Sequence, residues 1–226
     1  MKKVTLFTSL LLCVAILFAG CNASNTLKGT VIGAGAGAGV GAGIGALIGG
    51  KKGAAWGAGV GTVVGTGAGV LIGAKMDKQK KELEAIANAK VESANEGQAI
   101  KVTFDSGILF ASGKSDLNAA SQTSLIQFAN SLKANPDTYV EIYGHTDSQG
   151  GDNINIPLSK NRATSVENFL KNQGVTASRM ASTGVGSSQP VAAEDAKGIQ
   201  ALNRRVEIYI LPNEKMIQEA EAGTLK

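Results

Sequence analysis

Glycine recurs at every fourth position along two stretches of this chain, and this repeat constrains the folding of the N-terminal part more than any other feature. The two rows run over residues 33–49 and 57–73. At this spacing each row lies on one face of an α-helix, and a face without side chains lets two backbones approach closely. The segments 31–50 and 53–74 are each long enough to cross a hydrocarbon core. The repeat therefore predicts an apolar helical hairpin over residues 29–75.

Such a hairpin needs a bilayer or a helical partner. Each glycine inside a helix costs about 1 kcal/mol relative to alanine, so these helices are not stable alone in water. A flexible glycine-rich spacer is the alternative, but the many Val, Ile and Leu side chains make the stretch too apolar for a solvated linker. The repeat resembles the glycine-zipper domains of outer-membrane lipoproteins. We expect it to insert in a membrane; self-association through the glycine faces is the other possibility.

Residues 1–20 have the layout of a signal peptide. Lys2 and Lys3 precede an apolar run over residues 4–18 that is too short to span a bilayer comfortably. The run ends in Leu-Phe-Ala-Gly-Cys, which resembles the bacterial lipobox. The resemblance implies cleavage before Cys21, a diacylglyceryl group on its thiol and an acyl chain such as palmitate on its amine. The alternative is an ordinary secreted protein in which Cys21 is incidental.

Two neighbouring observations extend the lipoprotein interpretation. Cys13 lies in the segment to be removed, so no intramolecular disulfide is expected in the mature chain. Asn22 differs from the aspartate that commonly retains such lipoproteins at the inner membrane. By this resemblance we expect residues 21–28 to be an anchor and short linker in the outer membrane, with the C-terminal domain in the periplasm.

The charge of the chain argues against a nucleic-acid partner. The formal net charge is +4, from 22 Lys and Arg against 18 Asp and Glu, and two of these lysines belong to the signal peptide. Nucleic-acid binding domains carry a clustered basic surface, which this sequence lacks. We expect no nucleic acid, no metal and no cofactor.

Residues 76–97 become abruptly charged, with apolar side chains at near-helical spacing at Leu83, Ile86, Ala87 and Val91. They are predicted to form a spacer helix that leads to the next domain.

Residues 98–212 have the pattern of a small α/β domain, an α+β sandwich in architecture. Ile100, Val102 and Phe104 alternate as in a strand, and residues 108–110 would extend or repeat that pairing. The predicted order is strand, helix, strand, helix, strand, strand, over residues 100–104, 117–134, 139–144, 159–173, 179–184 and 206–210. This β-α-β-α-β-β order implies crossover connections within one sheet. Residues 213–226 are predicted to be a C-terminal tail.

Several motifs in this domain match one family in order and spacing. They are Gly144-His145-Thr146-Asp147, Gly150, Asn155, Leu158-Ser159, Arg162-Ala163, Gly174-Val175 and Asn203-Arg204-Arg205-Val206. The domain looks like an OmpA-like C-terminal domain, and the whole architecture resembles the outer-membrane lipoproteins of the YiaD type. The resemblance covers about half of the chain. It implies non-covalent binding of the peptidoglycan stem peptide, usually at its diaminopimelate residue.

The resemblance places the ligand-gripping pair at Asp147 and Arg162. Ser159 is expected to cap the second helix, which would put Arg162 in its first turn, where free N–H groups and the helix dipole favour an anion. A guanidinium there can hold a carboxylate, and Asp147 can hold an ammonium group, so the site suits a zwitterion. The alternative is that Asp147 and Arg162 simply form a salt bridge that closes the loop.

Other polar residues of the motifs each have two interpretations. Thr146 and Asn155 are candidate second contacts, although an Asx turn would also explain Asn155. Arg204 and Arg205 are neighbours in a strand, so at most one should face the groove and at least one should be structural. His145 invites a catalytic role, but a lone histidine at a strand end is more often structural.

The sequence departs from the family pattern at Phe110-Ala111-Ser112-Gly113. Related domains commonly carry an aspartate or asparagine there, so Ala111 and Gly113 put some of the usual polar contacts in question.

The preferred hypothesis is a tethering protein without catalytic residues, which anchors a membrane to the cell wall. One alternative is a wall-anchored stator or secretion-machine component whose hairpin inserts in a membrane. An ion-conducting role would require an ionisable residue inside the membrane helices, and these have none apart from the lysines between them. The other alternative, an envelope hydrolase, would require a metal cluster, paired carboxylates or a nucleophile with its base, and the sequence shows none of these.

Overall fold

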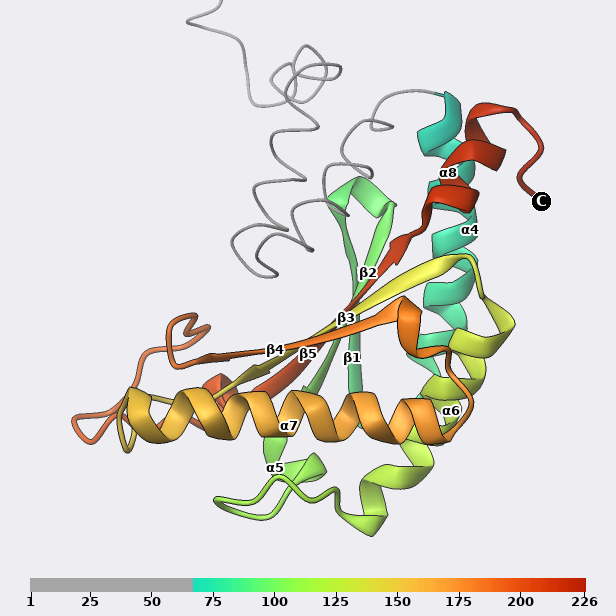
Figure 1. Ribbon diagram of the computed structural model, residues 1–226. Coiled ribbons are helices and arrows are strands. Elements are labelled where there is room, and N and C mark those ends of the chain that lie inside the picture. The colour runs from blue at the N-terminus through green and yellow to red at the C-terminus, as the bar shows by residue number, and fades with distance from the viewer. Residues whose placement is uncertain (1–66) are drawn as a thin grey trace, which may run out of the picture.

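The structure is a computed structural model that describes residues 67–226. These residues build a five-stranded sheet in the order β1-β2-β5-β3-β4 (Figure 1). The strands span Ala89–Ala94 (β1), Ala99–Asp105 (β2), Thr138–His145 (β3), Met180–Gly186 (β4) and Arg205–Pro212 (β5). Strands β3 and β4 pair in parallel, and the other three neighbouring pairs are antiparallel.

Helices cover one face of this sheet and one of its ends. Their bounds are Gly67–Glu84 (α4), Ser106–Leu109 (α5), Ala119–Ala134 (α6), Asp152–Asn172 (α7) and Glu214–Glu221 (α8), with 3-10 turns at Asn95–Gly97 (η2), Ala177–Arg179 (η3) and Ala201–Asn203 (η4). Helix α7 connects β3 to β4 and runs along the sheet, whereas α4 and α8 lie side by side at the other end (Figure 1).

The core forms where the apolar face of the sheet meets the helices. Val102 pairs with Ile208 in the register of β2 and β5, and both side chains are fully buried. On the helix side, Phe128 of α6 packs edge-on against Phe104 of β2, with ring centroids 6.1 Å apart. Alternation in the strands and helical periodicity in α6 thus direct their apolar side chains into one interior.

Two glycines let α7 approach the sheet backbone. A Cβ atom at Gly144 would lie 2.0 Å from the carbonyl oxygen of Ser159, and one at Gly184 would lie 2.3 Å from the amide nitrogen of Lys160. These positions on β3 and β4 therefore exclude any side chain. The contact fixes the middle of α7 against the end of β3.

The predicted β-α-β-α-β-β order over residues 98–212 is confirmed. Each of the four predicted strands and both predicted helices is present, and the sheet contains the expected crossover between β3 and β4. Residues 108–110 are an exception, because α5 occupies Ser106–Leu109 and only Phe110 forms a bridge, to Leu117. The side chain of Asp105 accepts a hydrogen bond from Gly107 N at 2.6 Å, which caps α5 and turns the chain out of the sheet.

The spacer helix predicted over residues 76–97 is wrong in its second half. Helix α4 ends at Glu84, and Asn88 takes a left-handed conformation with φ of 64° before β1 begins. Strand β1 then pairs antiparallel with β2 along its full length. Hydrogen bonding to the neighbouring strand outweighs the weak helical spacing of the apolar residues here.

The domain also extends beyond the predicted limits of 98 and 212. Ile72, Met76 and Leu83 of α4 are buried in the same core as the sheet. At the other end, the predicted tail contains α8, whose Met216 and Ala220 are buried where α8 packs on α4. The Asn213 side chain caps α8 by accepting a hydrogen bond from Met216 N at 2.9 Å. Helices α4 and α8 are therefore parts of the domain.

The expected signal peptide, Cys21 and the hairpin up to residue 66 lie outside the described residues. The last part of the predicted hairpin forms the start of α4, where Ala68 and Ile72 are buried. Within residues 67–226, no helix is both long enough and apolar enough to cross a membrane.

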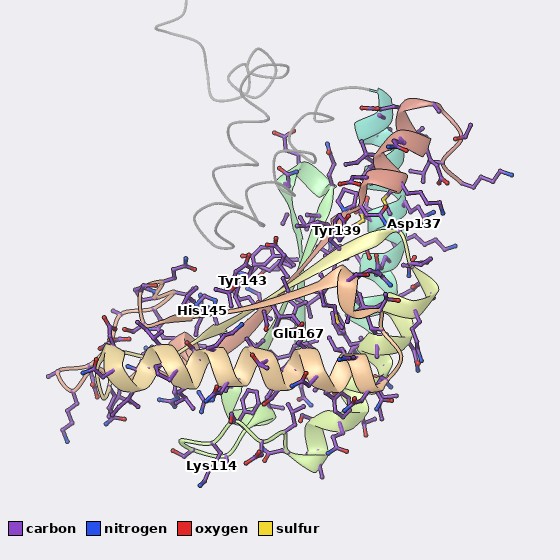
Figure 2. The ribbon with its side chains drawn as sticks, viewed as in Figure 1. Lys114, Asp137, Tyr139, Tyr143, His145 and Glu167 are labelled. Carbon is purple, nitrogen blue, oxygen red and sulfur yellow. The ribbon has the colours of Figure 1, made fainter. Side chains whose placement is uncertain are left out.

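A buried ionic network occupies the face of the sheet that points away from the core residues. The Glu207 carboxylate accepts hydrogen bonds from Arg205 Nε at 2.8 Å and Tyr209 Oη at 3.1 Å, and it pairs with Lys101 Nζ at 2.7 Å. His145 Nε2 lies 3.6 Å from the same carboxylate, and Figure 2 shows His145 near Tyr143 on β3. Burial lowers the pKa of His145, and the Arg205 charge lowers it further although Glu207 opposes this.

We predict that the shortened chain 98–212 is less stable than the chain 67–226. It lacks Ile72, Met76 and Leu83, and burial of each such side chain contributes about 1.5–3 kcal/mol. The free energy of unfolding, measured by urea titration, should fall by at least ~4 kcal/mol. The chain 67–212 is the control that separates the effect of α8. Equal stability of all three chains would contradict the assignment of α4 and α8 to the core.

We also predict that His145 makes the folded state sensitive to acid. Its pKa is lowered on folding, so the unfolded chain binds a proton more readily, and stability falls as pH drops below the ordinary histidine pKa. Between about pH 7.5 and about pH 5, the unfolding free energy of the wild type should decline more steeply than that of His145→Gln. The raised pKa of Glu141 acts in the opposite direction but equally in both proteins, so only the difference in slope is informative. Parallel slopes would contradict this prediction.

Candidate functional site

A pocket of about 600 Å³ opens at the end of the sheet where β3 runs out. Its walls come from α5 with the loop that follows it, from the loop after β3, from the first turns of α7 and from the chain just before β5. The charged side chains that line it are Asp147, Arg162 and Arg204. Two guanidinium groups thus face one carboxylate, and the pocket is electropositive.

Arg162 lies on the inner side of α7 and is only 4% exposed. Its Nε donates a hydrogen bond at 3.0 Å to the carbonyl oxygen of Lys114, which Figure 2 shows on the loop after α5. The guanidinium stacks near the Phe110 ring, with Cζ 5.3 Å from the centroid. Burial lowers the pKa of Arg162, the Arg204 charge lowers it further, and Asp147 raises it. Two contacts thus fix the guanidinium at the pocket wall.

The expected position of Arg162 in the first turn of a helix is wrong. Helix α7 begins at Asp152 after the left-handed Gly151, so Arg162 lies in its third turn. The Ser159 hydroxyl donates to the carbonyl oxygen of Ile156 and accepts from Gly186 N at 3.0 Å, so it ties α7 to β4 instead of capping a helix. The backbone dipole therefore contributes little at Arg162, and the guanidinium charge itself is what the pocket offers.

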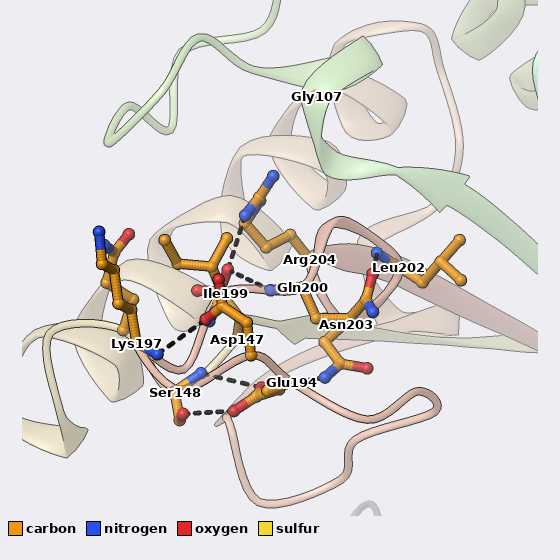
Figure 3. A network of polar contacts seen from close by, with 12 residues as sticks. Gly107, Asp147, Ser148, Glu194, Lys197, Ile199, Gln200, Leu202, Asn203 and Arg204 are labelled. Atoms are coloured by element: carbon orange, nitrogen blue, oxygen red, sulfur yellow. Dashed lines mark hydrogen bonds and ion pairs between the residues drawn. The ribbon is translucent and has the colours of Figure 1, made fainter.

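Asp147 is the second residue after the end of β3 and is 5% exposed. Its Oδ2 pairs with Arg204 Nη1 at 2.6 Å and accepts a hydrogen bond from Gln200 N at 3.2 Å (Figure 3). The sequence left open a salt bridge between Asp147 and Arg162. Within residues 67–226, Asp147 instead forms its salt bridge with Arg204. Arg162 lines the same pocket without that partner.

Thr146 and Asn155 both line the pocket, in different roles. Thr146 donates its backbone N–H to the Gly186 carbonyl at 2.9 Å, and within the described part of the chain its buried hydroxyl has no hydrogen-bond partner. The Asn155 amide donates to the carbonyl oxygens of Asp147 at 3.0 Å and Gln149 at 3.1 Å. Asn155 therefore holds the loop after β3 by donating to two distant carbonyl oxygens, a contact different from the Asx turn considered for it, and the Thr146 hydroxyl is free within the described residues.

The two neighbouring arginines point in opposite directions, as predicted. Arg204 reaches into the pocket, whereas Arg205 turns to Glu207 and to the carbonyl oxygens of Asn203 and Gln189. Ala111, Ser112 and Gly113 do line the pocket, so the departure from the family pattern falls at the site itself.

Some contributors to the site were not found from the sequence. Gln200 contacts Asp147 through its backbone N–H, and Lys114 contacts Arg162 through its carbonyl oxygen. Backbone groups carry no residue signature, so no sequence pattern indicates them. Phe110 was noted in a motif, but its stacking on Arg162 depends on the turn made by α5.

The described residues contain no group of three or more His, Cys, Asp or Glu side chains that could hold a metal ion. His145 is buried, and within the described residues neither ring nitrogen makes a hydrogen bond, although Nε2 lies 3.6 Å from the Glu207 carboxylate. It belongs to the ionic network of the sheet and does not line the pocket.

Comparison with protein families matches residues 109–204 to the OmpA family and residues 1–80 to the YMGG-like Gly-zipper. A relative named "Probable lipoprotein YiaD" from Escherichia coli (strain K12) is 36% identical over 141 residues, which are 62% of this chain and 64% of YiaD. The peptidoglycan-binding protein ArfA of Mycobacterium tuberculosis (strain ATCC 25618 / H37Rv) is 39% identical over 112 residues, which are 50% of this chain and 34% of ArfA. The chain thus covers less than two thirds of either relative.

Solved structures share the fold of the domain. The periplasmic domain of Helicobacter pylori MotB superposes with a TM-score of 0.51 at 20% identity, over 62% of this chain and 88% of that one. The cell wall anchor of the T6SS from Pseudomonas aeruginosa gives a TM-score of 0.52 at 27% identity, over 61% of this chain and 97% of that one. The resemblances seen in the motifs are confirmed: residues 109–204 match the OmpA family, and the sequence of residues 1–80 matches the YMGG-like Gly-zipper.

Proposed function

We propose that this protein binds peptidoglycan non-covalently, through the diaminopimelate residue of the stem peptide, in the pocket between α5 and α7. The observation that carries the proposal is the buried Arg162, which faces the pocket while Asp147 is paired with another arginine. The name of ArfA, a peptidoglycan-binding protein 39% identical to half of this chain, supports it. So does the likeness to the cell wall anchor from Pseudomonas aeruginosa.

The pocket offers both charges that an amino-acid centre requires. Arg162 uses Nε to bind Lys114, which leaves its two terminal nitrogens to hold a ligand carboxylate in a forked geometry. Asp147 uses Oδ2 for Arg204 and Gln200, and its Oδ1 can accept from the ligand ammonium. Each charge-assisted hydrogen bond contributes about 1.5–3 kcal/mol. The free hydroxyl of Thr146 and the side-chain oxygen of Asn155, whose amide nitrogen already holds the loop, are proposed second contacts.

Together with a membrane anchor at the N-terminus, wall binding in this pocket would tether the outer membrane to the cell wall. In this proposal residues 1–20 are removed, acylated Cys21 anchors the chain in the outer membrane, and the domain, now extended to residues 67–226, lies in the periplasm. The lipobox-like sequence and the lipoprotein name of the E. coli relative support the anchor. Each methylene of an acyl chain adds ~0.8 kcal/mol of membrane affinity, so several chains would release slowly. The glycine-zipper segment would insert in the membrane or associate with its own copies.

A second candidate function uses the same pocket within a larger assembly. The likeness to the anchor of a secretion system, with 27% identity over 61% of this chain, favours a wall-anchored component of such a machine. Both candidates require wall binding by Asp147 and Arg162, and neither requires catalysis.

We predict that Asp147→Ala and Arg162→Ala each weaken binding to purified sacculi by roughly ten- to a hundredfold, because each removes a charge-assisted contact of about 1.5–3 kcal/mol. The measurement is co-sedimentation of the full chain in detergent, with thermal unfolding to check that each variant is folded. Lys171→Ala is the matched control, since it removes an exposed positive charge from the same helix far from the pocket. Undiminished co-sedimentation of both folded variants would contradict the proposed site.

We also predict that the pocket discriminates against an amidated ligand. A carboxamide carries no charge for Arg162, so a stem tripeptide with amidated diaminopimelate should bind at least about tenfold more weakly than the free acid, because one charge-assisted bond is lost. Calorimetric titration of both tripeptides measures the ratio. In Arg162→Ala the two tripeptides should bind with nearly equal affinity. If the free acid still binds more tightly to this variant, the ligand carboxylate is held by another residue.

A further inference from the structure

The loop of residues 187–200, between β4 and η4, lies directly against the segment that carries Asp147. Gln149 N donates to the carbonyl oxygen of Gly198 at 3.2 Å, and Gln200 N donates to Asp147 Oδ2. Figure 3 shows that Glu194 of this loop points at Ser148. The loop therefore forms part of the support of the pocket.

The Glu194 carboxylate connects the two chain segments that meet in the Asp147–Arg204 ion pair. Its Oε1 accepts hydrogen bonds from Ser148 N at 3.1 Å and from Asn203 Nδ2 at 2.9 Å, and its Oε2 accepts from the Ser148 hydroxyl. Ser148 directly follows Asp147, and Asn203 directly precedes Arg204. One carboxylate thus sets the spacing between the neighbours of both ion-pair partners.

The loop that presents Glu194 is itself held in place. Asn203 is completely buried, and its Oδ1 accepts from Val191 N at 2.9 Å and Ala192 N at 3.0 Å. The turn beyond Glu194 brings Gly198 so close to Ser148 that a Cβ atom there would lie 2.4 Å from the hydroxyl oxygen, and the φ of Gly198 is +73°. Both ends of the loop therefore restrict where the Glu194 carboxylate can lie.

Glu194 is charged under neutral conditions. Hydrogen bonds from Ser148 and then from Asn203 lower its pKa, whereas partial burial and Asp195 raise it. Its contacts to Ser148 and Asn203 are accordingly charge-assisted, and such bonds are shorter and stronger than neutral ones.

We infer that Glu194 is a positioning residue of the pocket, which fixes the Asp147 carboxylate relative to Arg204 and thereby sets the affinity for the ligand ammonium group. This inference rests on the proposed function of the pocket. Glu194 itself does not line the pocket, so it acts through Asp147 and does not touch the ligand. A purely structural role in the loop would instead affect stability and leave binding unchanged in the folded protein.

The test is a calorimetric titration of the full chain, in detergent, with the tripeptide L-alanyl-γ-D-glutamyl-meso-diaminopimelate. Glu194→Ala should bind about tenfold more weakly, which is the scale of one charge-assisted hydrogen bond. Glu194→Gln keeps one acceptor oxygen and should recover part of the affinity. If Glu194→Ala does not fold, Ser148→Ala takes its place in the test, because it removes only the hydroxyl contact to Glu194. Glu221→Ala, an exposed glutamate at the end of α8, is the control for the change in charge.

A double-mutant cycle tests whether Glu194 acts on binding through Asp147, which a purely structural role of Glu194 would not require. In the Asp147→Ala background, Glu194→Ala should cause no further loss of affinity, because the residue through which it acts is gone. If the wild type binds the tripeptide and Glu194→Ala, folded, binds equally well, the inference is overturned and the proposed function stands. Equal losses with and without Asp147 would also overturn it. If the wild type fails to bind, the proposed function falls, and this inference falls with it.

Discussion

The backbone contact between α7 and the end of β3 is the constraint on which the pocket depends. Gly144 and Gly184 allow Ser159 and Lys160 to come within a distance that any side chain would prevent. This contact places Arg162 opposite Asp147, although one comes from the third turn of a helix and the other from a loop. A wider separation would leave the two charges unable to meet one ligand.

The electrostatics of the pocket follow from an unequal pairing of charges. Arg204 neutralises Asp147, and Arg162 is held by a carbonyl oxygen and an aromatic ring, neither of which carries a negative charge. Burying a charge without a counter-charge is costly, so the structure retains free energy that an anionic group can release on binding. Behind the Asp147–Arg204 ion pair, the hydrogen bond between Asn203 and Glu194 supports that side of the pocket.

Most of the central fold was predictable because its periodicities are strong. Alternation in β2 and β5 and helical spacing in α6 determined their positions. Strand β1 was missed because it is a short edge strand in which only Val91 is a large apolar residue, and only pairing with β2 explains its conformation. The start of α7 was missed because Asn and Ile alternate over residues 153–156, which is not helical spacing, and because Pro157 follows, which usually breaks a helix. The Asp147–Arg204 pair joins residues 57 positions apart and depends on the folded loop.

The arrangement of α4 has a mechanical consequence. Figure 1 places the beginning of α4 at the opposite end of the sheet from α5, which borders the pocket. Tension between the upstream chain and a ligand in the pocket would pass from α4 into β1 and then across the antiparallel ladder to β2 and β5. Pulling along the strands loads many hydrogen bonds in shear at once, so the sheet would resist extension far better than a hairpin opened one bond at a time. The edge strand β1 would thus carry this force into the sheet.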